Sequence, residues 1–418
     1  MNLEIKNGRV IDPQHHTDRV ASLFISGGRI AAQGLAPAGF VADRVIDVSG
    51  AVVCPGLIDL GARLNSIEAE LAAAVAGGVT SVVVPPDADP PLDEPELADR
   101  LVHRGAEIGK ARVLPLGALT LGLKGERLAE LAGLKKAGCV AFSQATQPVV
   151  DTEALLRAME YAASFGFAVW LQPQDYWLSR NGIAHEGEVA NRLGLAGIPV
   201  AAETIAIATI LQLARDTGCR VHLTRLSAAA GVALVAEAKA EGLPVTCDVS
   251  VHHLLLTEND IGFFNPHARF APPLRSQRDR QALSDAAANG LAAICSDHTP
   301  LGADDKLLPF GEAKPGATGL ETLLPLTLKW AAAANLDLPQ ALARITTAPA
   351  AILGLPLAGL APGAVADICI FDPAAEWQVN ADNLRSRGKN SPWLGHMLTG
   401  KIRATLVDGR VVFAERDS

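Results

Sequence analysis

Short apolar runs alternate with longer amphipathic segments through the middle of the chain, from about residue 51 onward. The apolar runs predict strands over residues 80–84, 113–116, 139–143, 168–172, 220–224, 245–249 and 292–296. The segments between them are rich in alanine and leucine and predict helices, including residues 151–165, 203–217 and 229–241. Strands separated by helices of this length form parallel sheets, and so many repeats favour a closed (β/α)8 barrel in an α/β fold. A doubly wound open sheet is the alternative, but no glycine-rich phosphate-binding fingerprint follows the first strand.

The two ends of the chain have a different pattern, in which short strands are separated by turns. Near the N-terminus, Asn7-Gly8 follows an apolar strand and predicts a hairpin, and Gly27-Gly28 predicts a second turn. Similar strands recur over residues 366–372 and 404–412. We therefore expect a small β-sandwich domain formed from residues 1–50 plus 357–418, beside a barrel of residues 51–356.

Composition narrows the range of partners. The 418 residues carry a formal net charge of −9 and no basic run, which argues against a nucleic-acid partner. No apolar stretch reaches the ~20 residues that span a bilayer, and the first residues lack a signal-peptide layout, so we expect no membrane association and a cytoplasmic location. The six cysteines contain no CxxC pair and are expected to be buried thiols. The stretch 302–319 is rich in glycine, proline and charge and predicts a long loop.

Several short motifs occur in an order that resembles the amidohydrolase superfamily, and more narrowly the dihydroorotases that are fused to or complexed with aspartate transcarbamoylase. The broad resemblance rests on the β domain formed from both termini, on the strand at residues 55–59 and on Ser296-Asp297-His298-Thr299-Pro300. The narrower one rests on residues 251–257, 271–275, 309–311, 319–322 and 388–392. It implies an amidohydrolase-type barrel with a metal centre at the carboxyl ends of its strands.

The residues expected at that metal centre are replaced. The resemblance places metal ligands at Gly61, Arg63, Gln144, Gln172 and Arg225, where active members carry histidines and aspartate. Glycine offers no ligand atom, and arginine stays protonated and has no lone pair to give a metal. Asp297 alone is kept, so the resemblance implies no metal, no cofactor and no catalytic residue.

Substrate contacts are replaced in the same way. The resemblance places them at Asn65, Pro86, Ala271 and Leu301, which differ in type from those of active members. The replaced metal-ligand positions and the replaced substrate-contact positions both lie at strand ends, while the framework motifs around them persist.

Other reactive-looking residues have structural interpretations. His252 and His253 are neighbours, and on a strand they would point to opposite faces and could not chelate together. His15 and His16 lie in a turn region, and His222 on an apolar strand is typical of a hydrogen-bonded core histidine. No Gly-x-Ser-x-Gly motif supports a serine nucleophile.

We therefore interpret the chain as a non-catalytic member of this family, whose Asp297 pairs with Arg63, Arg225 or both. The resemblance implies a role in holding or stabilising aspartate transcarbamoylase, in pyrimidine biosynthesis, as a hetero-oligomer with its catalytic chain. Self-association as a homodimer stays open. Two alternatives also stay open: an unorthodox cyclic-amide amidohydrolase such as a dihydroorotase, and a metabolite sensor that binds an anion at Arg63 and Arg225.

Overall fold

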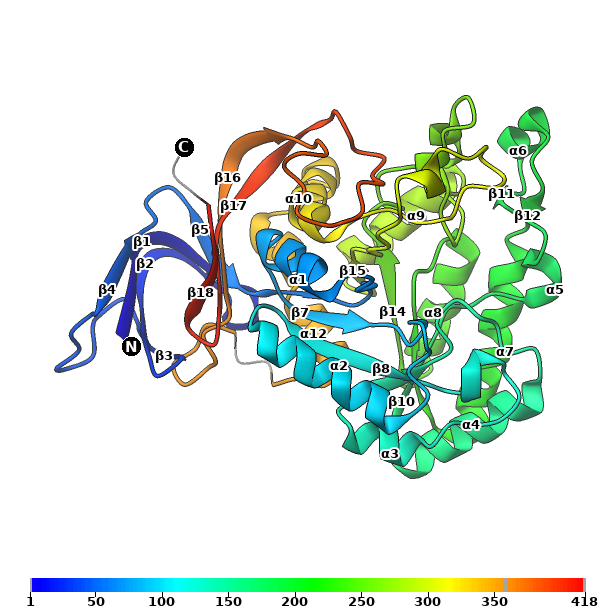
Figure 1. Cartoon of the computed structure of the whole chain (residues 1–418), viewed down its shortest axis with the longest axis horizontal. Coiled ribbons are helices and arrows are strands. Elements are labelled where there is room, and N and C mark those ends of the chain that lie inside the picture. Colours follow the sequence, from blue (N-terminus) through cyan, green and yellow to red (C-terminus); the bar gives the residue numbers. More distant parts are fainter. Residues whose placement is uncertain (1, 357–358, 416–418) are drawn as a thin grey trace.

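The computed structural model describes residues 2–356 and 359–415 and has two main parts, a barrel and a sheet beside it (Figure 1). The barrel strands are parallel and are paired in chain order. They are β6 (Leu57–Asp59), β7 (Val79–Val84), β8 (Arg112–Ala118), β9 (Ala141–Ser143), β10 (Ala168–Leu171), β13 (Arg220–Leu223), β14 (Val245–Ser250) and β15 (Ala292–Cys295). A doubly wound sheet would reverse its strand order, so the barrel prediction is confirmed.

Helices cover the outside of this barrel. They are α1 (Ile67–Ala76), α2 (Pro95–Ile108), α3 (Leu131–Lys136), α4 (Thr152–Ser164), α7 (Ala201–Thr217), α8 (Ala229–Ala240), α9 (Gln277–Ala288), α10 (Leu323–Ala333), α11 (Leu338–Ala343) and α12 (Thr347–Leu353). Their apolar faces and the strands form one large core. None of the helices in the described part of the chain combines the length and the apolar character that crossing a bilayer requires.

The barrel closes between its first and last strands without a regular ladder. At the mouth, the His298 amide donates to the Gly61 carbonyl at 3.1 Å and the Arg63 amide to the His298 carbonyl at 2.9 Å. Lower down, Ile58 of β6 donates to Ile345, and Ile294 of β15 donates to Arg344. The segment 344–345 therefore fills the seam between the two strands.

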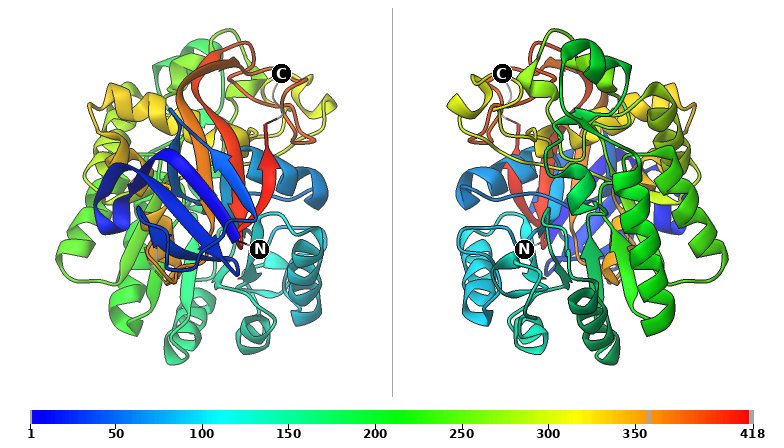
Figure 2. Two further views of the ribbon diagram at one scale, coloured as in Figure 1. Left: turned by 90° about the vertical axis from the view of Figure 1, so that its left-hand side faces the viewer. Right: turned by 90° about the vertical axis from the view of Figure 1, so that its right-hand side faces the viewer.

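The second sheet combines strands from both termini, as expected. Its strands are β1 (Asn2–Asp12), β2 (Thr17–Ser26), β3 (Arg29–Gln33), β4 (Arg44–Asp47), β5 (Val52–Pro55), β16 (Ile368–Gln378), β17 (Met397–Val407) and β18 (Arg410–Ala414). Figure 2 (left) looks onto this sheet, with the barrel behind it. The predicted domain boundary at residue 357 and the chain end at residue 418 lie outside the described residues, so the boundaries stay a prediction.

One predicted turn is wrong. Asn7-Gly8 does not close a hairpin, because β1 runs straight through it with a shift of register between Ile5 and Gly8. Asn7 adopts a φ of 65°, and a Cβ on Gly8 would come within 2.6 Å of Val53 Cγ2. The dipeptide therefore marks a bulge with close backbone approach, which has the same residue preference as a tight turn.

The remaining short elements lie in the connections. They are α5 (Tyr176–Ser179), β11 (Ala184–His185), α6 (Glu188–Leu193), β12 (Gly197–Ile198), and the 3-10 turns Pro13–His15, Leu121–Leu123, Glu258–Ile261, Pro266–Ala268, Asp304–Lys306 and Leu320–Thr322. The segment 302–319 is mainly loop, as predicted, with Asp304–Lys306 as its helical turn. All six cysteines are buried and reduced, also as predicted.

Candidate functional site

At the barrel mouth, the residues that follow three of the strands adopt a left-handed backbone conformation. Ala145, Arg225 and Asp297 follow β9, β13 and β15, and their φ angles are 51°, 55° and 49°. Non-glycine residues rarely adopt the left-handed region, and such strain gathers at functional sites. The backbone at this mouth is therefore shaped like that of a functional site.

Arg225 and Asp297 form an ion pair at the centre of the mouth. Arg225 Nη1 donates to Asp297 Oδ1 at 2.9 Å, and the two side chains are 11% and 4% exposed. Arg225 Nη2 donates to Gln172 Oε1. Burial disfavours the Arg225 charge, but the Asp297 carboxylate outweighs burial and raises the arginine pKa. Of the two expected pairings for Asp297, the structure forms the one with Arg225.

Arg63 reaches the same mouth but pairs elsewhere. Its Nη2 donates to Asp87 Oδ2 at 2.7 Å, and its Nη1 donates to Thr299 Oγ1 at 3.0 Å. Asp87 follows the double proline after β7 and was not singled out from the sequence. A carboxylate just beyond a strand end was the available signal, but its partner could not be identified without the fold.

Asp248 is a second acid that sequence reasoning missed. It lies within β14 and is buried, and it accepts from His222 Nε2 at 2.9 Å and from the Arg225 amide at 2.9 Å. His222 Nδ1 contacts Thr246 Oγ1 at 2.8 Å, which confirms this histidine as a hydrogen-bonded core residue. A lone aspartate inside an apolar strand was the signal that could have identified Asp248.

The mouth holds little space. A cavity of about 30 Å³, which we call the mouth pocket, is lined by residues including Gly61, Arg63, Ala145, Arg225, Asp248 and Asp297. One water molecule needs about 10–15 Å³ of cavity volume, so the mouth pocket has room for two or three.

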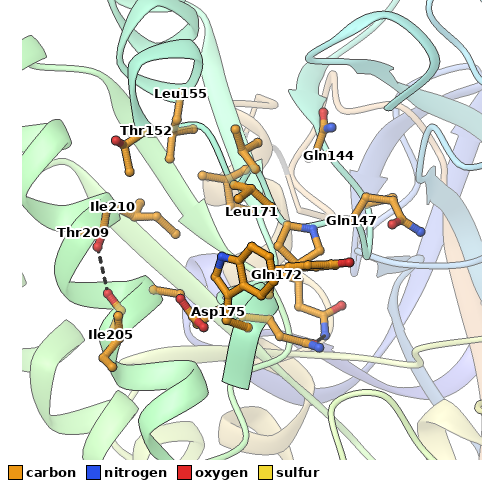
Figure 3. A pocket seen from close by; sticks show the side chains of 18 residues that line it. Gln144, Gln147, Thr152, Leu155, Leu171, Gln172, Asp175, Ile205, Thr209 and Ile210 are labelled. Atoms are coloured by element: carbon orange, nitrogen blue, oxygen red, sulfur yellow. Dashed lines mark hydrogen bonds between the residues drawn. The ribbon is translucent and has the colours of Figure 1, made fainter. Parts of the chain in front are cut away.

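Gln144 and Gln172 do not line this cavity. They border a second cavity of about 120 Å³, the side pocket, which lies between the loops after β9 and β10 and helix α7 (Figure 3). The Gln144 amide donates to the Thr120 hydroxyl at 2.8 Å, and the Gln172 amide donates to Gln174 Oε1 at 3.2 Å. The structure therefore separates the predicted ligand positions into two pockets.

The four predicted substrate positions also lie outside the residues that line the mouth pocket. Asn65 donates to the Pro300 carbonyl at 2.8 Å, and the Leu301 amide donates to Asn390 at 2.9 Å. The Pro86 carbonyl accepts from Leu92 at 3.0 Å, and Ala271 precedes a cis proline. In this structure these residues support loops.

The donor set at the mouth does not fit a hydrolytic metal centre. Such a site needs three or more histidine, cysteine or carboxylate ligands with free lone pairs. Among the described residues no group of three such side chains is placed to hold a metal ion. Asp297 and Asp248 already accept from Arg225 and His222, and burial raises the pKa of Cys295 well above its usual value.

His252 and His253 have structural contacts, but not for the predicted reason. They lie in a turn after β14 and not on a strand. His252 Nδ1 accepts from Trp393 Nε1 at 3.0 Å, and His253 Nε2 contacts the Pro272 carbonyl at 3.1 Å. Burial lowers their pKa values to about 3 and about 4. His15 and His16 lie at the turn predicted for them.

Known proteins resemble the chain over its whole length. A family model described as "Dihydro-orotase-like" matches residues 50–230. A dihydroorotase-like protein of Pseudomonas aeruginosa is 44% identical over 98% of this chain and 99% of its own. A dihydroorotase of Pelobacter propionicus is 40% identical over 99% and 100%.

Among solved structures, an L-hydantoinase (dihydropyrimidinase) from Arthrobacter aurescens matches with a TM-score of 0.88 and 26% identity, covering 100% of this chain and 96% of that one. The barrel and the terminal sheet thus have the arrangement of known amidohydrolases. The chain therefore belongs to the dihydroorotase-like family of the amidohydrolase superfamily.

Proposed function

We propose that this chain is a non-catalytic dihydroorotase-like subunit that supports the assembly of aspartate transcarbamoylase in pyrimidine biosynthesis. The observation that carries the proposal is the ion pair between Arg225 and Asp297. In active relatives, as the family resemblance implies, this aspartate binds metal and takes the proton of the attacking water. Here the Arg225 guanidinium is hydrogen-bonded to that carboxylate, and a guanidinium cannot act as a Lewis acid.

The small size of the mouth pocket also supports the proposal that the chain is non-catalytic. With room for two or three waters, it cannot enclose a cyclic amide that carries a carboxylate. The Arg225 and Gln172 side chains occupy the space between the strand ends. Catalysis would require both side chains to leave and the buried ion pair to break, which typically costs about 3–5 kcal/mol.

A scaffold acts through contacts at its surface, and the loop 302–319 beside the mouth provides a surface for such contacts. Its Leu307 is 80% exposed, and Leu308 beside it is half-exposed. Long loops at the carboxyl ends of barrel strands can change function without disturbing the core. We expect this loop or the outer helices to contact the transcarbamoylase catalytic chain.

Reconstitution with the transcarbamoylase catalytic chain from the same organism tests the proposal. Light scattering after size exclusion gives particle mass, and carbamoyl aspartate formation gives activity, each with and without this chain. We expect a larger particle and higher or more stable activity in its presence. Arg225→Met combined with Asp297→Asn, which removes both charges of the buried pair, should leave both effects unchanged. Unchanged mass and activity on adding this chain would contradict the proposal.

A second candidate is dihydroorotase activity, which the name of the Pelobacter propionicus relative favours. Interconversion of dihydroorotate and carbamoyl aspartate should be assayed after incubation with zinc, with Asp297→Asn as the control. Turnover that Asp297→Asn abolishes would establish the enzyme and replace the scaffold proposal.

The anion-sensor alternative has less geometric support. Arg63 and Arg225 each already pair with a carboxylate, Asp87 and Asp297 respectively. An anion would have to displace one of these acids, so neither guanidinium offers a free positive charge.

A further inference from the structure

The side pocket adjoins the mouth pocket, with Ala145 lining both, but it has a different chemical character. Gln172, hydrogen-bonded to Arg225, stands between the two. In Figure 3, Leu155, Ile205 and Ile210 line one side of the side pocket, and Gln144 and Gln147 lie on the other. The volume of about 120 Å³ is four times that of the mouth pocket.

Apolar and aromatic groups surround the opening. Trp177 is 61% exposed, and Tyr176 packs edge-on against it with ring centroids 5.1 Å apart. Arg180 stacks over the Trp177 ring, with its guanidinium carbon 4.5 Å from the ring centroid. Exposed aromatic side chains beside a concave apolar surface are typical of ligand sites.

The polar groups of the side pocket are mainly uncharged amides. Within the described chain, the Gln147 side chain makes no hydrogen bond and therefore offers both a donor and an acceptor, while the Gln174 amide nitrogen offers a donor. The single charged side chain in the lining is Asp175, whose Oδ1 accepts from the Leu178 amide at 2.9 Å to cap α5. Of the described residues that line the pocket none is a lysine or an arginine, so an anion finds no countercharge within the lining.

We propose that the side pocket binds a small uncharged ligand with a flat apolar ring and a carboxamide edge. The ring would pack between Trp177 and the aliphatic side of the pocket, and the carboxamide would pair with Gln147 and Gln174. Each water-sized group needs about 12 Å³ of cavity volume. The side pocket of about 120 Å³ therefore accommodates a ligand of about ten non-hydrogen atoms. The site does not depend on the proposed scaffold function.

Three probes of equal shape test the charge requirement. Benzamide, benzoate and benzamidine differ mainly in charge, and calorimetry on the full chain compares their affinities. We expect benzamide to bind with a Kd of about 1 mM or tighter, a range that ligands of this size reach. Benzoate should bind at least tenfold more weakly, because the lining holds an acid and no cation. Benzamidine should also bind more weakly than benzamide, because Asp175 Oδ1 is already engaged in capping α5. Equal or tighter binding of either ion, or no binding of benzamide, would overturn the proposal.

Variants then place the ligand. Gln147→Leu, at an exposed rim position, should weaken benzamide at least fivefold, and Ala206→Leu should abolish binding by filling the cavity. Leu178→Ala is the control, because Leu178 is 39% exposed on α5 next to Trp177 but does not line the pocket. Benzamide affinity that Gln147→Leu leaves unchanged would contradict the assignment, even if Ala206→Leu failed to fold.

Discussion

Arg225 Nη1 lies 2.9 Å from Asp297 Oδ1, and both groups are buried at the mouth of the barrel. Arg225→Met should therefore leave an uncompensated carboxylate and lower the free energy of unfolding by about 3–5 kcal/mol. Urea unfolding monitored by circular dichroism measures the change. Adding Asp297→Asn to Arg225→Met should recover much of the loss.

Arg63→Met is the matched comparison. Arg63 and its partner Asp87 are each 19% exposed, against 11% and 4% for Arg225 and Asp297, so the loss should be smaller than that of Arg225→Met. Equal losses in the two single variants would mean that burial of the Arg225 pair does not determine its contribution.

Two buried histidines should lower stability in mild acid, and one buried carboxyl group should partly offset them. Burial lowers the pKa of His252 to about 3 and of His253 to about 4, so below pH 6.5 the unfolded chain binds two protons that the folded chain does not. Burial raises the pKa of Asp59 to about 6, so between pH 6 and 4 the folded chain binds one extra proton. From these three groups alone the net difference is one proton, so they contribute a loss of about 1.4 kcal/mol per pH unit from pH 6 to 4.

Denaturant unfolding at several pH values checks this slope. His253→Gln keeps a donor for the Pro272 carbonyl but cannot titrate, so its loss of stability between pH 6 and 4 should be smaller than that of the parent chain by about 1.4 kcal/mol per pH unit. A flat profile in the parent chain would show that the two histidines do not control acid stability.

Alanine substitutions at Gly8 and Gly61 should differ sharply in their effect on stability. A Cβ on Gly8 would meet Val53 Cγ2 at 2.6 Å and Val48 Cγ2 at 2.8 Å, whereas one on Gly61 meets nothing within 4 Å. Gly8→Ala should destabilise by about 1–3 kcal/mol, because overpacking forces side chains from their preferred positions. Gly61→Ala should change stability by less than about 0.5 kcal/mol. Thermal unfolding that ranks the variants in reverse would contradict the predicted steric difference.

Restoring the side chains of an active site should create metal binding. Gly61 has room for a larger side chain, and replacing Arg225 frees Asp297. The variant combines Gly61→His, Arg63→His, Gln144→Asp, Gln172→His and Arg225→His. We expect it to retain about one zinc or more per chain by elemental analysis, since histidine and aspartate are the ligands that zinc prefers.

The parent chain should retain only substoichiometric zinc under the same conditions. Adding Asp297→Ala to the five changes should reduce the zinc content. A five-residue variant with no more zinc than the parent chain would show that the mouth has lost its metal-binding geometry as well as its ligands.

The regular parts of the fold followed from the sequence because local hydrophobic periodicity determines them. The strand predicted over residues 245–249 is β14, and the helix predicted over 203–217 is α7, each correct to within two residues. The Asn7-Gly8 turn was wrong, because the choice between a turn and a bulge depends on contact with Val53 in a distant strand.

The candidate site was less predictable for the same reason. The replaced positions could be identified from the sequence, but their partners could not. Whether Asp297 pairs with Arg63 or Arg225 depends on Asp87, which comes from a different strand end. The side pocket forms from three segments that only the folded barrel brings together.

The seam of the barrel has a consequence for how the chain is made. Because Arg344 and Ile345 fill the gap between β6 and β15, the first barrel strand has no partner on that side until nearly the whole barrel has left the ribosome. An unpaired strand edge is a template for aggregation. Nascent or prematurely terminated chains that end before residue 344 should therefore depend on chaperones, whatever the finished protein does.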